Sequence, residues 1–161
     1  MSMTRIARIE IDDAGLAVPS PEIEQERRVA IFDLLEDNSF QLPGRPGQPA
    51  PSGPFALLLA MRQGRLVFDT TTESGEKLAE FQLAMGPFRQ AVKDYHQICA
   101  SYFDAVKTLQ PAQIEAIDMA RRGIHNEGAR ILQERLEGKA ELDIDTARRL
   151  FTLICVLNAG G

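Results

Sequence analysis

The sequence predicts an α+β fold in which an antiparallel β-meander packs against a C-terminal group of helices. In residues 55–85, three runs place apolar residues at every second position, on one face of a strand, and the links between the runs are too short for helical crossovers. From residue 88 onward, apolar residues recur every three or four positions, as in helices with one buried face. The length predicts one domain over residues 1–161, because a chain of this size buries roughly 68–70% of its unfolded surface.

The N-terminal part predicts one strand and one helix. Residues 4–11 form a β-like run with three isoleucines and predict the first strand. Ser20 and Pro21 predict a helix start, with a hydroxyl cap and proline at the first position, and the helix extends to about Asp37. Three acids crowd its last turn, where the helix dipole disfavours negative charge: Asp33, Glu36 and Asp37. We expect one of them to meet an arginine from the C-terminal half.

Residues 41–54 hold five of the nine prolines and three glycines, and predict a connector without regular structure. A Pro-x-x-Pro ligand for an aromatic groove is the functional alternative. Strands are then predicted over residues 55–61, 66–72 and 77–85, with Gln63 and Gly64 as a two-residue turn. One face of this meander must be covered by helices.

Three helices are predicted after the meander. The first opens at Gly86-Pro87, and we expect the meander to pack on it. Its apolar stripe is a core seam or a seam for a partner helix, and comprises Phe88, Val92, Tyr95, Cys99, Tyr102, Val106 and Leu109. The second runs from Pro111 to about Glu137, and Asp145 is the predicted cap of the last. Residues 150–157 are nearly all apolar, so we expect the last helix to be buried. This apolar surface beside the long stripe favours a homodimer formed through helices.

The composition argues against several classes of protein. With 23 Asp and Glu against 18 Lys and Arg, the net charge of −5 argues against a general nucleic-acid binder. Local RNA binding is a weaker hypothesis, because no aromatic residues are interleaved with its five arginines, Arg121, Arg122, Arg130, Arg148 and Arg149. The chain shows no signal peptide and no run of about 20 apolar residues, which predicts a cytoplasmic protein without a membrane segment.

The two cysteines, Cys99 and Cys155, stand in apolar helical patterns and predict buried reduced thiols. Neither a Cys-x-x-Cys pair nor a Cys/His spacing of the zinc type is present, so we expect no metal site. Phosphate-binding glycine loops and nucleophile-elbow motifs are also missing, so no cofactor is predicted.

One polar cluster interrupts the apolar face of the helix from Pro111. Asp118, Arg121, Arg122 and His125 can meet on one side of that helix, because they are separated by three, four and seven residues. A carboxylate, two guanidinium groups and an imidazole there have the chemistry to bind an anion or to move a proton. The structural alternative is that Arg121, nearest the centre of the apolar stripe, pairs with an acid and joins two helices.

Two glycines complicate this cluster, because glycine is unfavourable inside a helix. Either Gly128 lies on the buried side and permits close approach of another backbone, or the helix breaks at Gly123 and Gly128. In a broken helix the four side chains would not share one face.

Four stretches resemble an uncharacterised family of small bacterial cytosolic proteins that is known only by a provisional family number. They are Ile31–Phe40, Val92–Tyr95, Gln113–Gly128 and Asp145–Leu157. The resemblance covers nearly the whole chain and implies a cytosolic protein, but it carries over no activity and no functional residues.

Two functional hypotheses lead. The first is a non-enzymatic binding or regulatory protein that engages a protein partner or a small anionic ligand through its helical half. The second is an enzyme that acts on a phosphate-bearing small molecule through Asp118, Arg121, Arg122 and His125.

Overall fold

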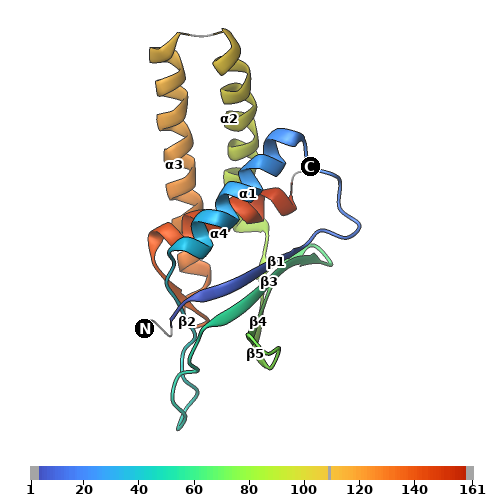
Figure 1. Cartoon of the computed structure of the whole chain (residues 1–161), viewed down its shortest axis with the longest axis vertical. Coiled ribbons are helices and arrows are strands. Elements are labelled where there is room, and N and C mark those ends of the chain that lie inside the picture. Colours follow the sequence, from blue (N-terminus) through green and yellow to red (C-terminus); the bar gives the residue numbers. More distant parts are fainter. Residues whose placement is uncertain (1–3, 109, 159–161) are drawn as a thin grey trace.

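The computed structural model describes residues 4–108 and 110–158. The chain forms a sheet, a group of four helices beside it, and a short pair of strands that joins distant loops (Figure 1). The elements are β1 (Ile6–Asp12), α1 (Pro21–Glu36), β2 (Phe40–Gln41), β3 (Phe55–Arg62), β4 (Arg65–Thr72), β5 (Lys77–Ala84), the 3-10 turn η1 (Gly86–Phe88), α2 (Arg89–Thr108), α3 (Pro111–Arg135), β6 (Glu141–Leu142) and α4 (Ile144–Leu157).

The sheet has the strand order β1-β3-β4-β5. The predicted meander is confirmed, since β3, β4 and β5 pair antiparallel in sequence order. Gln63 and Gly64 form the predicted turn, and both have positive φ angles of 54° and 77°, which suit a two-residue hairpin. The sheet is not wholly antiparallel, because β1 adds a parallel edge beside β3. The α+β prediction is therefore confirmed, with one parallel pairing added.

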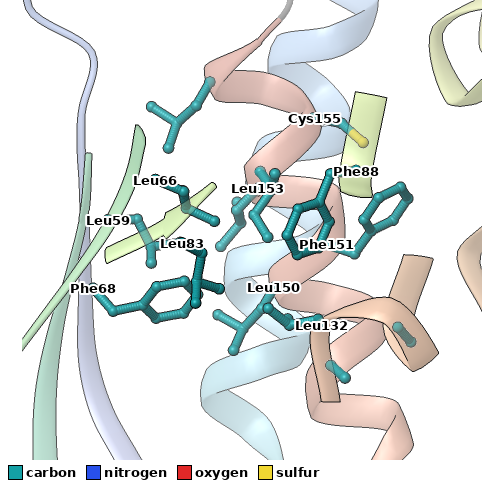
Figure 2. Packing of buried hydrophobic residues seen from close by; sticks show 14 of the residues in the cluster. Leu59, Leu66, Phe68, Leu83, Phe88, Leu132, Leu150, Phe151, Leu153 and Cys155 are labelled. Atoms are coloured by element: carbon teal, nitrogen blue, oxygen red, sulfur yellow. The ribbon is translucent and has the colours of Figure 1, made fainter. Parts of the chain in front are cut away.

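The core lies between this sheet and α4 (Figure 2). Leu59, Leu66 and Leu83 of the sheet point toward Leu150 and Leu153 of α4. Residues 150–157 are all buried, as predicted, because α1 and α3 pack on α4 and the sheet covers another side. We expected the helix after Gly86-Pro87 to cover the meander, but α4 lies closer to it. Within the described part of the chain, no helix is long and apolar enough to cross a membrane.

The helices α2 and α3 lie side by side as a hairpin that projects beyond the rest of the molecule (Figure 1). The apolar stripe of α2 is buried only in its first part, from Phe88 to Cys99. Tyr102 is half-buried and the side chain of Val106 is 49% exposed, while Leu109 lies outside the described residues. The predicted seam therefore ends where the hairpin leaves the core.

The helix caps agree with the sequence at α1 but not at α4. The Ser20 hydroxyl accepts a hydrogen bond from the backbone of Ile23 at 3.2 Å, as predicted for α1. At α4 the prediction of Asp145 as cap is wrong. The carboxylate of Asp143 accepts from the backbone N–H of Thr146 at 3.0 Å, and Asp145 lies within the first turn.

The C-terminal turn of α1 is stabilised by arginines, but through its backbone. Arg5 donates to the carbonyl of Leu35 at 2.8 Å, and Arg149 donates to the carbonyl of Asp37 at 3.4 Å. Among the described residues, none of the three carboxylates in this turn forms an ion pair within 4.0 Å. Positive guanidinium groups at the negative end of the helix dipole offset part of the unfavourable effect of the three acids in this turn.

Helix α3 is continuous through both glycines. Gly128 is buried, and a Cβ atom built there would lie 2.5 Å from three carbons of the Phe151 ring on α4. The expected close approach therefore occurs, but its partner is an aromatic ring and not a backbone. Gly123 has no atom within 4 Å of such a Cβ position, so its side of α3 is open.

Candidate functional site

A cleft of about 270 Å³ lies where α1, α3 and α4 meet. It brings together all four residues of the predicted cluster, Asp118, Arg121, Arg122 and His125. Further side chains from α1 and α4 complete its wall, and the polar ones are Glu26, Asp33, Asp145, Arg148, Arg149 and Thr152. We call this the charged cleft.

Arg121 is more enclosed than Arg122 and Arg148 of the charged cleft. It forms an ion pair with Glu26 of α1, and its guanidinium carbon lies 5.5 Å from the centre of the Tyr102 ring. The two charged side chains are only 22% and 13% exposed. Burial is the largest single influence and lowers the pKa of Arg121, but the interactions with Glu26, Cys99 and Tyr95 together outweigh it, so the pKa lies above its ordinary value. Arg121 thus joins α3 to α1, as the structural alternative predicted, with Glu26 as the acid.

Arg122 and Arg148 are held more loosely, each by an acid of its own helix. Arg122 lies 2.9 Å from Asp118 and its side chain is 67% exposed. Arg148 lies 3.5 Å from Asp145, with 36% of its side chain exposed. Ion pairs of this exposed kind contribute about 0.3–0.5 kcal/mol in a helix. Both guanidinium groups are therefore available to a competing anion at little cost.

His125 lies at the inner end of the charged cleft with both ring nitrogens in contact with hydrogen-bonding groups. Nδ1 is 3.0 Å from the backbone oxygen of Arg121, which only accepts, so Nδ1 carries the proton in the neutral ring. Nε2 is 3.0 Å from the hydroxyl of Thr152, whose single proton is shared between Nε2 and the carbonyl of Arg148 at 3.3 Å. Burial lowers the pKa of His125, and the charges of Arg121 and Arg148 act in the same direction. The imidazole is thus neutral and fixed in orientation near pH 7.

The region behind the charged cleft is uncharged. The thiol of Cys99 lies 3.9 Å from a carboxylate oxygen of Glu26, and burial raises the pKa of Cys99 to about 11. Burial also raises the pKa of Tyr95, whose ring meets that of His125 edge-on at 5.2 Å between centroids. Cys99 is therefore a thiol and not a nucleophilic thiolate at neutral pH. Among the described residues, no group of three or more His, Cys, Asp or Glu side chains is placed to hold a metal ion.

The sequence analysis missed the contributions of α1 and α4 to the charged cleft. Glu26 and Asp33 are spaced seven residues apart on α1, which places them on one face, but nothing local indicates that this face meets α3. From the sequence, Arg148 and Arg149 indicate only the weaker hypothesis of local RNA binding. Tertiary packing alone brings them beside Arg122.

The comparisons with known proteins identify a family. Residues 3–159 match the model of the uncharacterised protein family UPF0262. A UPF0262 protein of Paracoccus denitrificans is 76% identical over 159 residues, which cover 99% of this chain and 98% of the relative. Relatives from Roseobacter denitrificans and Ruegeria pomeroyi are 71% and 68% identical, over 99% and 100% of this chain and 100% of each relative. No solved structure matches the chain. The resemblance is confirmed, and the chain belongs to the UPF0262 family.

Proposed function

We propose that the protein is a non-enzymatic binding protein whose charged cleft takes a small phosphate-bearing ligand. One observation carries this proposal: Arg122 of α3 and the pair Arg148 and Arg149 of α4 line the same cleft, and none of the three is held in a buried ion pair. The planar guanidinium group donates two parallel hydrogen bonds to phosphate oxygens. A phosphate between the two helices would replace weak surface pairs with stronger charge-assisted bonds.

The same geometry favours binding over catalysis. A general base needs a nitrogen that can reach the substrate proton. In His125 both nitrogens are already engaged, one with a backbone carbonyl and one with Thr152. The nearest thiol, that of Cys99, is buried and protonated. Use of His125 as a general base would therefore require one of these contacts to break, and Cys99 offers no nucleophilic thiolate.

The carboxylates in the charged cleft bear on which phosphate compound fits. Four arginines are matched there by four acids, so the cleft has no formal excess of positive charge. Asp33 is half-buried and forms no ion pair within 4.0 Å with any described residue. A ligand with only negative charge would be repelled by Asp33, whereas one that also carries an ammonium group would pair with it. We expect tighter binding of O-phosphoethanolamine than of inorganic phosphate.

The test is a calorimetric titration of the whole protein with these two compounds at constant ionic strength. Arg122→Gln and Arg148→Gln should each weaken binding about tenfold, because a hydrogen bond to a charged group is worth about 1.5 kcal/mol or more. Arg130→Gln is the matched control. Arg130 also lies on α3 in an exposed pair with an acid three residues away, but it does not line the cleft.

Saturable binding that is lost in the two cleft variants and kept in the control would support the proposal. Two results would overturn it: no saturable heat with either compound, or equal weakening in all three variants. Equal weakening would mean that the compounds respond to the overall charge of the protein and not to the cleft.

A further inference from the structure

A second cavity, of about 510 Å³, lies between the first half of α2 and the ends of the meander strands. Its wall comprises Met61, Gly64, Met85, Arg89, Val92, Lys93, His96, Gln97 and Asn158. None of these residues lines the charged cleft, so the two hollows are separate. The volume is within the range of about 300–1,000 Å³ that is typical of small-molecule sites. We call it the α2 pocket.

The inner wall of the α2 pocket is apolar. Met85 and Val92 are 6% and 7% exposed, and Met61 at the end of β3 is half-buried beside them. Methionine side chains are flexible and polarisable, so two of them form a surface that adapts to ligands of different shape. The volume and lining thus suit an aliphatic or aromatic body.

The rim of the α2 pocket is cationic. Arg89 and Lys93 are both exposed, and neither forms an ion pair with any residue in the described ranges. They are four residues apart on α2, where two like charges repel each other and destabilise a helix by about 0.2–0.5 kcal/mol. No acidic side chain of the described residues lines the pocket. The charged cleft differs in this respect, because its four arginines are accompanied by four carboxylates in the same lining.

Two polar groups at the pocket wall are held in fixed positions. His96 Nε2 donates to the carbonyl of Cys155 at 2.9 Å, and its Nδ1 has no hydrogen-bond partner among the described residues. Asn158 donates to the carbonyl of Ile154 at 2.8 Å and contacts the sulfur of Met61 at 3.8 Å. A few fixed polar groups beside an apolar floor are what orients a ligand in a small-molecule site.

From this arrangement we infer that the α2 pocket binds a small amphipathic carboxylic acid. The carboxylate lies between Arg89 and Lys93, and the hydrocarbon part lies on Met61, Met85 and Val92. A single negative charge relieves the repulsion between the two cations, while the hydrocarbon part removes apolar surface from water. The cationic rim distinguishes this ligand from a neutral or cationic one of the same shape.

The test uses octanoate as the probe, below its micelle concentration, on the whole protein labelled with ¹³C at the methionine methyl groups. Saturable shifts are expected for Met61 and Met85. Met119 is the internal control, because it lies on α3, is 63% exposed and does not line the pocket. Octylamine and octanol are the matched probes with reversed and absent charge, and both should bind at least tenfold more weakly than octanoate.

Variants test the rim. Arg89→Gln and Lys93→Gln should each weaken octanoate binding about threefold, and together roughly tenfold, because partly exposed charge pairs contribute up to about 1 kcal/mol. Lys107→Gln, an exposed cation at the far end of the same helix, should leave the affinity unchanged. The inference is overturned by shifts that do not saturate, by equal binding of octylamine, or by equal effects of all three variants.

Discussion

Replacing Gly128 with alanine sets two effects on α3 against each other. Alanine is more favourable than glycine inside a helix by about 1 kcal/mol. The new Cβ would, however, lie 2.5 Å from three carbons of the Phe151 ring, whereas carbon atoms pack best at about 3.5–4.0 Å. The ring must move by about 1 Å. Phe151 is fully buried in the core of Figure 2, so the movement displaces its neighbours and costs about 3 kcal/mol. We expect a net loss of about 2 kcal/mol.

The matched control is Gly123→Ala, five residues earlier on the same helix. Because no atom lies within 4 Å of its Cβ position, this variant should show only the gain of about 1 kcal/mol. Thermal unfolding followed by circular dichroism should give a Tm about 4–8 °C lower for Gly128→Ala and about 2–4 °C higher for Gly123→Ala. In a double-mutant cycle, Phe151→Leu should remove most of the penalty at position 128. Equal stabilisation by both alanines would refute the tight α3–α4 packing.

Four further outcomes are expected. Arg121→Ala should lower the free energy of unfolding in urea by about 3 kcal/mol, because Glu26 stays largely buried without its partner; an unchanged midpoint would contradict the structural role. Burial lowers the pKa of His125, so the unfolded chain takes up a proton that the folded one does not. The contribution of His125 to the free energy of unfolding should be fully present above about pH 6.5 and should be lost as the pH falls below that value. In urea titrations at a series of pH values, His125→Gln should therefore show a smaller loss of stability at low pH than the unchanged protein. Cys99 and Cys155 should resist iodoacetamide at pH 8 until urea is added, because both are buried and their thiol pKa values are raised; rapid native alkylation would argue against this packing. We still predict a homodimer formed through helices. Because the last helix is buried, we expect its interface at the exposed end of the α2–α3 hairpin, and light scattering at high micromolar concentration should give twice the monomer mass.

The predicted elements that agree with the structure depend on neighbours in the sequence. Alternation with a two-residue turn defines β3 and β4, and both turn residues have the backbone conformation that such turns require. Ser20 and Pro21 start α1 because the cap bond spans only three residues. The wrong cap of α4 is a local ambiguity, since Asp143 and Asp145 are both acids near the same start and only the backbone conformation selects between them.

The candidate site was predictable only in part. Asp118, Arg121, Arg122 and His125 share one face because a continuous helix places them there, and the sequence alone determines that spacing. The sequence left open whether the helix continues through Gly128; α3 is continuous there, and Gly128 packs against the ring of Phe151 from α4. The opposite wall of the charged cleft comes from α1 and α4, and no periodicity encodes which helices become neighbours.

The sequence by itself determined the four strands of the main sheet, the helices and the buried last helix, because each follows from short-range patterns of polarity, caps and turns. It did not predict the short pair β2 and β6, in which Gln41 of the predicted connector pairs with Glu141, 100 residues away. The tertiary structure decided that Arg121 pairs with Glu26, 95 residues away, and not with the acid on its own helix. It also decided that α4 covers the sheet and that the end of the α2 stripe stays exposed. These outcomes depend on how helix faces fit together in three dimensions. A face with the right period can pack on several neighbours, and only the packing of the whole chain selects one.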